Sequence, residues 1–403
     1  MRDVKYGMAG GFSDVTMNRG AAQAFEAGGY DFMIWADQMS LTIPRSIWTP
    51  DIIPVAAVVD VDAYMEPWPL ATDAATHTER MELGITVCDA FRRMPANYAQ
   101  LALTLDHYSQ GRFFLAMGTG EMRHFSPYGV PRERPFTHLQ EQVKIIKLLM
   151  ESDGPVNYEG PIWNLDRAVM TLKPYGDTPP PVMVAGGGRA RTIAGTYGDG
   201  WITMQPFGST PERYAEDVVY VKECAEKAGR DPDALRFHCT AFVLIGTDDD
   251  AVEALVNHPL SKWDAAALIT DAELYKTYDG TDHPIRPDYN YARDLVSMNW
   301  SREDALAIID KVTPAHVRGA RTCGTPNEVA AALQPYIEAG ANYLNIVDYS
   351  PLLGSSGQFG EAGEAIDVCG ATVARLRKLN GQPAFAPAVP SGEVAGANAG
   401  ASA

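Results

Sequence analysis

Two glycine-rich segments contain the residues best suited to hold a phosphate-bearing ligand. One is Gly118-Thr119-Gly120-Glu121, and the other is the run AGGGRART over residues 185–192. Glycines in a turn let the backbone approach a ligand closely, and the amides at the start of a helix attract phosphate. Each segment alone would also fit an ordinary tight turn. Together, after neighbouring strands of one sheet, they predict a single phosphate-bearing cofactor that touches both.

Polar side chains follow other apolar runs in the same way. Asp37 and Gln38 come directly after Phe-Met-Ile-Trp-Ala, and Glu121 closes the first glycine turn. Glu121 could face a bound cofactor or water, and Asp37 could equally cap the next segment. His124, just beyond Glu121, could bind substrate or be a solvated loop residue. All four are candidate site residues.

Eight short apolar runs predict the strands that would position these residues. The runs alternate with helical patterns, as the strands of a parallel sheet covered by helices do. Eight such units favour a closed (β/α)8 TIM barrel, an α/β fold whose chemistry sits at the C-terminal ends of the strands. The runs are Val4–Met8, Phe32–Ala36, Glu82–Val87, Phe113–Met117, Pro181–Ala185, Trp201–Met204, Phe237–Ile245 and Tyr343–Val347.

Two connections are too long for simple barrel loops, namely residues 37–80 after strand two and residues 246–321 after strand seven. We expect both to form folded insertions, and the second to form a lid-like region. The predicted organisation is a single barrel domain over residues 1–381. A tail over residues 382–403, rich in Ala, Pro, Gly and Ser, is predicted to be disordered.

Two helix starts are marked by capping residues. Thr325, Pro326 and Glu328 predict an N-cap, a proline in the first turn and an acid near the positive helix end. Thr137, followed by glutamine three positions later, predicts a capping box. These signals concern structure and carry no chemistry.

The charge balance and the cysteine pattern argue against several classes of partner. The 403 residues include 33 Lys+Arg and 51 Asp+Glu, for a formal net charge of −18. This balance argues against nucleic acid or an anionic membrane surface, and no apolar run is long enough to span a bilayer. No signal-peptide core follows the first charges, which favours a cytoplasmic protein. Five cysteines without a CxxC pair, and eight histidines without an HxH or HExxH motif, argue against a metal site.

Longer segments of the chain resemble a known family. Residues 83–121, LGITVCDAFRRMPANYAQLALTLDHYSQGRFFLAMGTGE, and residues 180–203, PPVMVAGGGRARTIAGTYGDGWIT, resemble the luciferase-like monooxygenase superfamily, specifically its branch that uses coenzyme F420. The segments IPRSIW, YMEPWP and HFSPYGV resemble the phthiodiolone ketoreductase group within that branch. The likeness covers residues 1–205 and then 324–348, whereas the region 250–320 resembles nothing that we can name.

The resemblance implies a barrel that binds a deazaflavin at the C-terminal ends of its strands. It places Asp37 beside the deazaflavin and Glu121 near the N1 side of the ring. It also implies a non-prolyl cis peptide bond at Thr86–Val87 behind the ring. The matched cofactor contacts are completed by the backbone of Gly118, Thr119 and Gly120, and by a phosphate loop of Ala185, Gly186 and Gly187.

At one position the chain departs from the pattern. The F420-dependent sugar-phosphate and alcohol dehydrogenases have a histidine base after the strand-two acid, where this chain has Gln38. An amide cannot take up a proton at neutral pH, so Gln38 can orient a substrate oxygen but cannot act as a base. Either another group moves the proton, for which Glu66, His124 and Glu121 are candidates, or the reaction differs from alcohol oxidation. In both cases a sugar phosphate becomes a disfavoured substrate. Trp48, Trp68 and Tyr64 suggest a roomy, fairly apolar substrate pocket, to which Glu66 and His124 would also contribute.

Three functions stay open at the level of the sequence. The leading one is an F420-dependent oxidoreductase that moves a hydride between the deazaflavin C5 and a ketone, an alcohol or an activated double bond of an apolar small molecule. The second is an FMN-dependent monooxygenase of the same superfamily. The third is a barrel that binds a cofactor without catalysis. The resemblance further implies a homodimer that packs through barrel helices.

Overall fold

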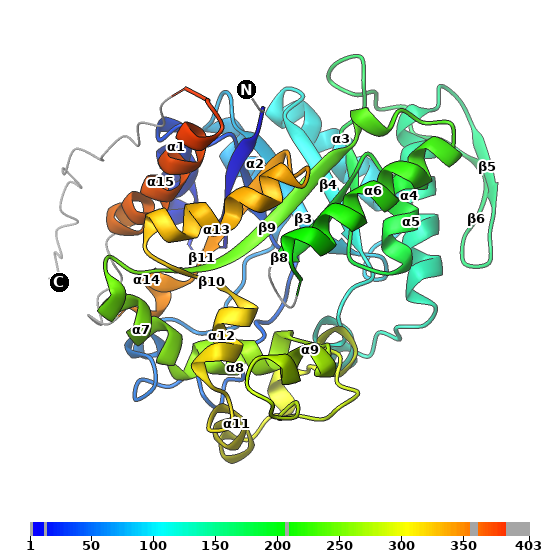
Figure 1. Cartoon of the computed structure of the whole chain (residues 1–403). Helices are drawn as coiled ribbons and strands as arrows, with labels where there is room; N and C mark the ends of the chain where they lie inside the picture. The colour runs from blue at the N-terminus through cyan, green and yellow to red at the C-terminus, as the bar shows by residue number, and fades with distance from the viewer. Residues whose placement is uncertain (1–2, 12–13, 206–208, 355–361, 384–403) are drawn as a thin grey trace, which may run out of the picture.

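Eight parallel strands close into a barrel (Figure 1). The computed structural model describes residues 3–11, 14–205, 209–354 and 362–383. The ring closes where β1 pairs with β11, with Lys5 opposite Tyr343. Every predicted apolar run forms a strand, so the predicted (β/α)8 barrel is confirmed. The barrel strands are β1 (Lys5–Gly10), β2 (Phe32–Trp35), β3 (Glu82–Asp89), β4 (Phe113–Gly118), β7 (Val182–Ala185), β8 (Gly200–Gln205), β9 (Arg236–Ile245) and β11 (Tyr343–Asp348).

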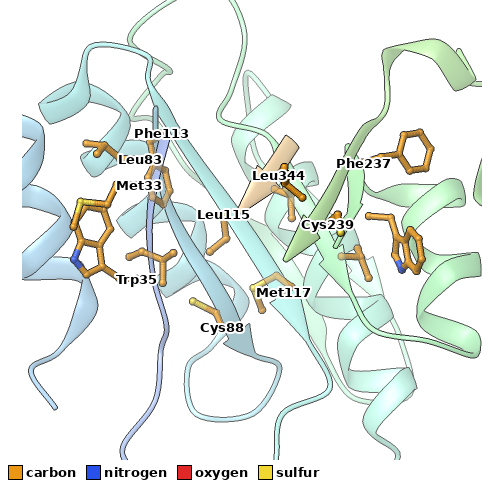
Figure 2. Packing of buried hydrophobic residues seen from close by; sticks show 14 of the residues in the cluster. Met33, Trp35, Leu83, Cys88, Phe113, Leu115, Met117, Phe237, Cys239 and Leu344 are labelled. Carbon is orange, nitrogen blue, oxygen red and sulfur yellow. The ribbon is translucent and has the colours of Figure 1, made fainter. Parts of the chain in front are cut away.

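The strands are apolar throughout because both of their faces are covered. Inside the barrel, the rings of Phe32 and Phe114 meet edge to face at 6.3 Å. A Cβ at Gly84 would lie 2.2 Å from the Phe114 ring, so the centre of the barrel requires glycine there. Outside, Met33 and Leu83 belong to the large buried cluster between strands and helices (Figure 2). The covering helices are α1 (Val15–Ala27), α2 (Pro67–Thr76), α3 (Pro95–Ser109), α4 (Pro135–Glu151), α5 (Arg189–Tyr197), α6 (Pro211–Lys227), α13 (Pro326–Glu338) and α15 (Ala362–Leu379).

Of the two predicted helix starts, one is confirmed and one is wrong. Thr325 and Glu328 form the capping box of α13, and the Thr325 amide donates to Glu328 Oε2 at 2.8 Å. Helix α4 instead begins at Pro135, so Thr137 lies inside its first turn. A proline with its fixed φ suits the first helical position and begins the helix two residues earlier.

Both long connections fold, and they pack against each other. The first contains the short 3-10 helix η1 (Pro54–Ala57). The second contains α7 (Asp249–Asn257), α8 (Pro259–Leu268), α9 (Ala272–Thr277), α10 (Tyr291–Asp294), η5 (Ser297–Asn299), α11 (Arg302–Ile309) and α12 (Pro314–Ala320). A second hydrophobic cluster joins them, with Ile43 and Trp48 from the first and Leu260 and Trp263 from the second. We call residues 38–65 and 247–321 the cover layer.

The cover layer lies at the end of the barrel toward which the strands run (Figure 1). Its two parts are tied by hydrogen bonds as well as by apolar contact. Trp263 Nε1 donates to the Thr42 carbonyl at 3.0 Å, and Arg302 Nη1 donates to Thr49 Oγ1 at 2.7 Å. A short strand, β10 (Thr322–Gly324), then leads back to the barrel by pairing with the end of β9. The insertions predicted after strands two and seven therefore enclose the mouth of the barrel.

A hairpin and the first residues of the predicted tail complete the described part of the fold. A hairpin of β5 (Val156–Glu159) and β6 (Asn164–Ala168) stands beside α4 and α5 (Figure 1). Of the predicted tail, residues 384–403 lie outside the described part, and Gln382 hydrogen-bonds the Val4 carbonyl at 2.8 Å. No helix in the described ranges is long and apolar enough to cross a membrane.

Candidate functional site

The ends of four neighbouring strands bring the predicted cofactor residues together. The sheet order β2-β3-β4-β7 places Asp37, Thr86, Gly118 and Ala185 at successive strand ends around one half of the mouth. The register agrees, since Asp89 pairs with Gly118. The C-terminal ends of parallel strands are where TIM barrels hold their ligands.

The backbone at the ends of β3 and β4 forms the floor of this half of the mouth. The peptide bond between Thr86 and Val87 is cis, as the resemblance implies, and the pairing of β3 with β4 shifts register at this point. A Cβ at Gly118 would lie 2.7 Å from Val87 Cγ1, so only glycine lets the two strands approach this closely. Gly120 has φ +68°, and a Cβ there would lie 2.3 Å from the ring of Phe125. The glycines of this turn are thus required by packing as well as suited to a ligand.

Asp37 is buried and held by two arginines from the end of β3. Arg92 Nη2 lies 3.0 Å from Asp37 Oδ1, and Arg93 Nη1 lies 2.6 Å from Asp37 Oδ2. Arg92 also pairs with Asp89. With both oxygens engaged, the Asp37 carboxylate ties the end of β2 to the end of β3 and positions the backbone around it.

An arginine also holds Glu121, but part of the Glu121 side chain stays exposed to solvent. Arg123 Nε donates to Glu121 Oε2 at 2.6 Å, while the rest of the Arg123 guanidinium contacts the Ser40 carbonyl and lies 3.5 Å from Gln38 Oε1. The Glu121 side chain is 25% exposed, against 8% for Arg123. The structure thus brings Glu121 and Gln38 together through one shared arginine.

His124 has a structural position in the same loop. Its ring is buried, and Nδ1 accepts a hydrogen bond from the Met39 amide at 3.2 Å. Burial, followed by the positive charges of Arg123 and Arg92, lowers the pKa of His124 to about 2. The ring is therefore neutral at physiological pH and fastens the β4 loop to the cover layer. This removes His124 from the groups that could deliver a proton near neutrality.

The remaining predicted substrate residues do not meet at the mouth. Glu66 is exposed, caps α2 by accepting from the Trp68 amide at 2.8 Å, and pairs with Arg93. Trp68 packs between α2 and the barrel, 5.6 Å from the ring of Phe113. Trp48 lies in the apolar cluster of the cover layer, where its Nε1 donates to the Val59 carbonyl at 2.7 Å. The structure gives each of these three side chains a packing or capping position, and their part in substrate binding stays a prediction.

The glycine run after β7 forms an open turn that leads into α5. Gly186 has φ +114° and Gly188 has φ +54°, and nothing lies within 4 Å of a Cβ built at Gly187 or Gly188. In the described part of the chain, the amides of Gly187, Gly188 and Arg189 donate to no backbone oxygen. Free amides at a helix start, in open space, suit an anion. Arg191 is not available to it, since it pairs with Asp217.

Three tyrosines lie near the Glu121–Arg123 pair: Tyr64, which the sequence suggested for the pocket, and Tyr291 and Tyr349, which it did not. Helix α10 packs against the loop that carries Arg123 and so brings Tyr291 to the mouth. Burial raises the pKa of Tyr291 and the Glu121 carboxylate raises it further, whereas Arg123 lowers it. Burial also raises the pKa values of Tyr64 and Tyr349, and Arg123 lowers both. No motif marks Tyr291 or Tyr349, because Tyr291 comes from the cover layer and Tyr349 follows β11.

The donor set fits a cofactor with a planar ring and a phosphate tail. The cis-peptide floor and the open glycine turn stand on nearby strand ends, β3 with β4 and then β7. A metal site has no such support, since no group of three or more possible ligands occurs in the described ranges. Arg132 strengthens the floor by donating from Nε to the carbonyl oxygens of Thr119 and Gly120 at 3.1 and 3.0 Å.

Two known proteins are similar in sequence to most of this chain. The chain is 32% identical over 319 residues to a phthiodiolone/phenolphthiodiolone dimycocerosates ketoreductase of Mycobacterium kansasii, which covers 78% of this chain and 86% of the relative. It is 29% identical over 338 residues to an F420-dependent glucose-6-phosphate dehydrogenase of Kineococcus radiotolerans, covering 81% of this chain and 88% of the relative.

Solved structures share the fold at lower identity. An F420-dependent secondary alcohol dehydrogenase in complex with an F420-acetone adduct superposes with a TM-score of 0.68 and 21% identity, covering 92% of this chain and 99% of that one. A long-chain alkane monooxygenase superposes with a TM-score of 0.63 and 18% identity, covering 94% and 92%. The sequence relatives are oxidoreductases, which confirms that class for this chain. The family model for luciferase-like monooxygenases matches residues 5–343, and the chain belongs to that family.

Proposed function

We propose that this protein is an F420-dependent oxidoreductase that reduces a ketone or an activated double bond, or oxidises the corresponding alcohol, in an apolar small molecule. One observation carries the proposal: the close approach of Gly118 to Val87 and the open turn at Gly186–Gly188 stand on nearby strand ends of one mouth. The relatives that are named for F420 or for ketone reduction support it.

Each part of the mouth has a role in this reaction. When bound, the deazaflavin supplies or accepts a hydride at its C5. The floor would support the ring, and the amides of Gly187 and Gly188 would hold the phosphate end. Glu121 would place its charge near the ring, and Asp37 would position the end of β2 through its two arginines. Gln38 would orient the substrate oxygen.

His124 and Glu66 are less suited than Glu121 to move the proton. His124 is neutral and hydrogen-bonded to the backbone, and Glu66 lies on the surface in an ion pair. Glu121 is left among the three predicted candidates, with its carboxylate 25% exposed and Tyr291 beside it. We therefore propose Glu121 as the group that stabilises charge at the cofactor and exchanges the proton.

The FMN-dependent monooxygenase is the second candidate, because the long-chain alkane monooxygenase has the same fold. A turnover assay separates the two. With reduced F420 and a panel of ketones and enones, the proposal predicts substrate-dependent oxidation of F420 that needs no oxygen. Oxygen uptake with reduced FMN, without turnover of F420, would assign the protein to the monooxygenases. Turnover with neither would favour a barrel that binds its cofactor without catalysis.

A further inference from the structure

A buried arginine stands at the rim of the mouth, opposite the cofactor floor. Arg321 precedes β10, whose Thr322 pairs with Val243 of β9, so Arg321 lies beside the end of β9. Its side chain is buried, with 1% exposed, and its guanidinium lies 4.2 Å from the centre of the Tyr349 ring and 5.6 Å from that of Phe242. Aromatic rings from β9 and from the end of β11 therefore wall this part of the mouth.

Arg321 forms an ion pair with one carboxylate, and the buried Asp348 also interacts with its charge. Arg321 Nη2 pairs with Asp264 Oδ2 on α8, and Asp264 is only 4% exposed. Thr42, from the other part of the cover layer, donates to Asp264 Oδ1 at 3.5 Å. Arg321 Nε and Nη1 donate to no protein atom in the described part of the chain. Two donors thus stay unpaired although the charge itself is compensated.

Four other arginines at the mouth are also ion-paired or hydrogen-bonded. Within the described residues, Arg92 and Arg93 pair with Asp37, Arg123 pairs with Glu121, and Arg132 donates to the carbonyl oxygens of Thr119 and Gly120. What the mouth offers instead is the hydroxyl groups of Tyr64, Tyr291 and Tyr349 and the amide of Gln38. Around Arg321 the mouth therefore presents hydroxyl and amide groups and a compensated charge, which suits an uncharged substrate better than a phosphate or a carboxylate.

We propose that Asp264 determines specificity by neutralising Arg321, so that the mouth accepts uncharged carbonyl compounds and rejects anionic ones. The proposal rests on the proposed function for the statement that the substrates are carbonyl compounds. The anion affinity of the mouth can be measured without that function. Removing the Asp264 charge would leave a guanidinium with unpaired donors at the rim. A buried arginine without its partner is unfavourable, and an anion that enters would compensate it.

The test is the Asp264→Asn variant, which keeps the size of the side chain and removes its charge. Inorganic phosphate is the probe, and sodium chloride at equal ionic strength is the reference. We expect phosphate to bind to this variant at least tenfold more tightly than to the wild type, by calorimetry and by the rise in melting temperature. Any phosphate that binds at the glycine turn of residues 186–188 would bind equally in both proteins, so only the difference between them counts.

Two further variants keep the outcome interpretable. Glu253→Gln removes a carboxylate that pairs with Arg318 elsewhere in the cover layer, and it should not increase phosphate binding. Asp264→Asn/Arg321→Met removes the whole buried pair, and it should lose the added phosphate affinity. If Asp264→Asn is recovered in phosphate but not in chloride, that recovery supports the proposal.

An Asp264→Asn protein that is equally unstable in phosphate and in chloride, while the double variant folds, would overturn the proposal and leave the pair as a structural tether. A folded Asp264→Asn protein with wild-type phosphate affinity would overturn it too. No F420 is present in these experiments, so either result is independent of the cofactor assignment.

Discussion

Arg123 donates from Nε to Glu121 at 2.6 Å and, with the other side of its guanidinium, contacts the Ser40 carbonyl. The Glu121 carboxylate is therefore fixed relative to the chain that follows β2, and with it to Gln38. The ion pair with Arg123 fixes the Glu121 carboxylate in one position, while 25% of the side chain stays exposed. Glu121 can therefore present its negative charge to a ligand at a fixed place. This relationship gives Glu121 its part in the proposed chemistry.

Replacing Glu121 by glutamine should reduce turnover by about tenfold or more, because the charge beside the ring and the exchangeable proton are both lost. Cofactor affinity should change little, since the floor and the glycine turn stay intact. Steady-state rates and fluorescence titration measure the two effects separately. Glu133→Gln, an exposed acid in the same loop, is the matched control. Unchanged turnover in Glu121→Gln would remove Glu121 from the mechanism.

Replacing Gln38 by histidine should leave the fold intact, because Gln38 is only half-buried. An imidazole can take up a proton where an amide cannot, so we expect a gain in the oxidation of secondary alcohols. Gln38→Asn, which shortens the amide and adds no base, should show no such gain. If the histidine variant oxidises alcohols no faster than the wild type, the argument from the missing base fails.

A negative charge at the glycine turn should weaken cofactor binding. Gly187→Glu places a carboxylate in open space next to the amides that start α5, and it should raise the cofactor Kd by at least about tenfold through repulsion of the phosphate. Gly187→Ala adds only a methyl group to the same open space and should bind normally. Equal affinity of the Glu and Ala variants, measured by titration, would show that the phosphate end binds elsewhere.

The buried His124 should make the protein less stable in acid. Its pKa is lowered to about 2, whereas an unfolded histidine titrates near 6.5, so the unfolded chain binds the proton first as the pH falls. His124 alone therefore contributes a progressive loss of stability below pH 6.5, about 2 kcal/mol at pH 5. The buried His238, whose pKa is also lowered, adds to the total loss. Denaturant unfolding from pH 7.5 to 5 measures this loss.

Two variants test the assignment of that loss to His124. The loss should shrink in His124→Asn, whose amide oxygen can still accept from Met39, and it should persist in His107→Asn on the surface of α3. An equal loss in the wild type and in His124→Asn would contradict the assignment.

The strands and the cofactor half of the mouth could be predicted from the sequence, because both depend on local patterns. A strand covered on both faces is apolar throughout, as Phe32–Trp35 is, and a turn open to a ligand is rich in glycine, as at Gly186–Gly188. The cis bond at Thr86–Val87 followed from the resemblance.

The substrate half could not be predicted, because it is assembled from distant segments. Tyr64 was suggested for the pocket, but Tyr291 and Tyr349 come near Arg123 only in the folded chain, and no spacing in the sequence records that. Trp48 and Trp68 were predicted for the pocket from their type alone. An aromatic ring near a site serves packing as readily as binding, and both rings are buried in apolar clusters.

The most direct test of the account is a titration of the purified apoprotein with F420 and, separately, with FMN, followed by quenching of tryptophan fluorescence. The account predicts tight, saturable binding of F420 and much weaker binding of FMN, with the F420 affinity reduced in Gly187→Glu. Tight binding of FMN and weak binding of F420 would contradict it and place the protein among the flavin monooxygenases. Binding of neither would show that the glycine turns serve the fold alone.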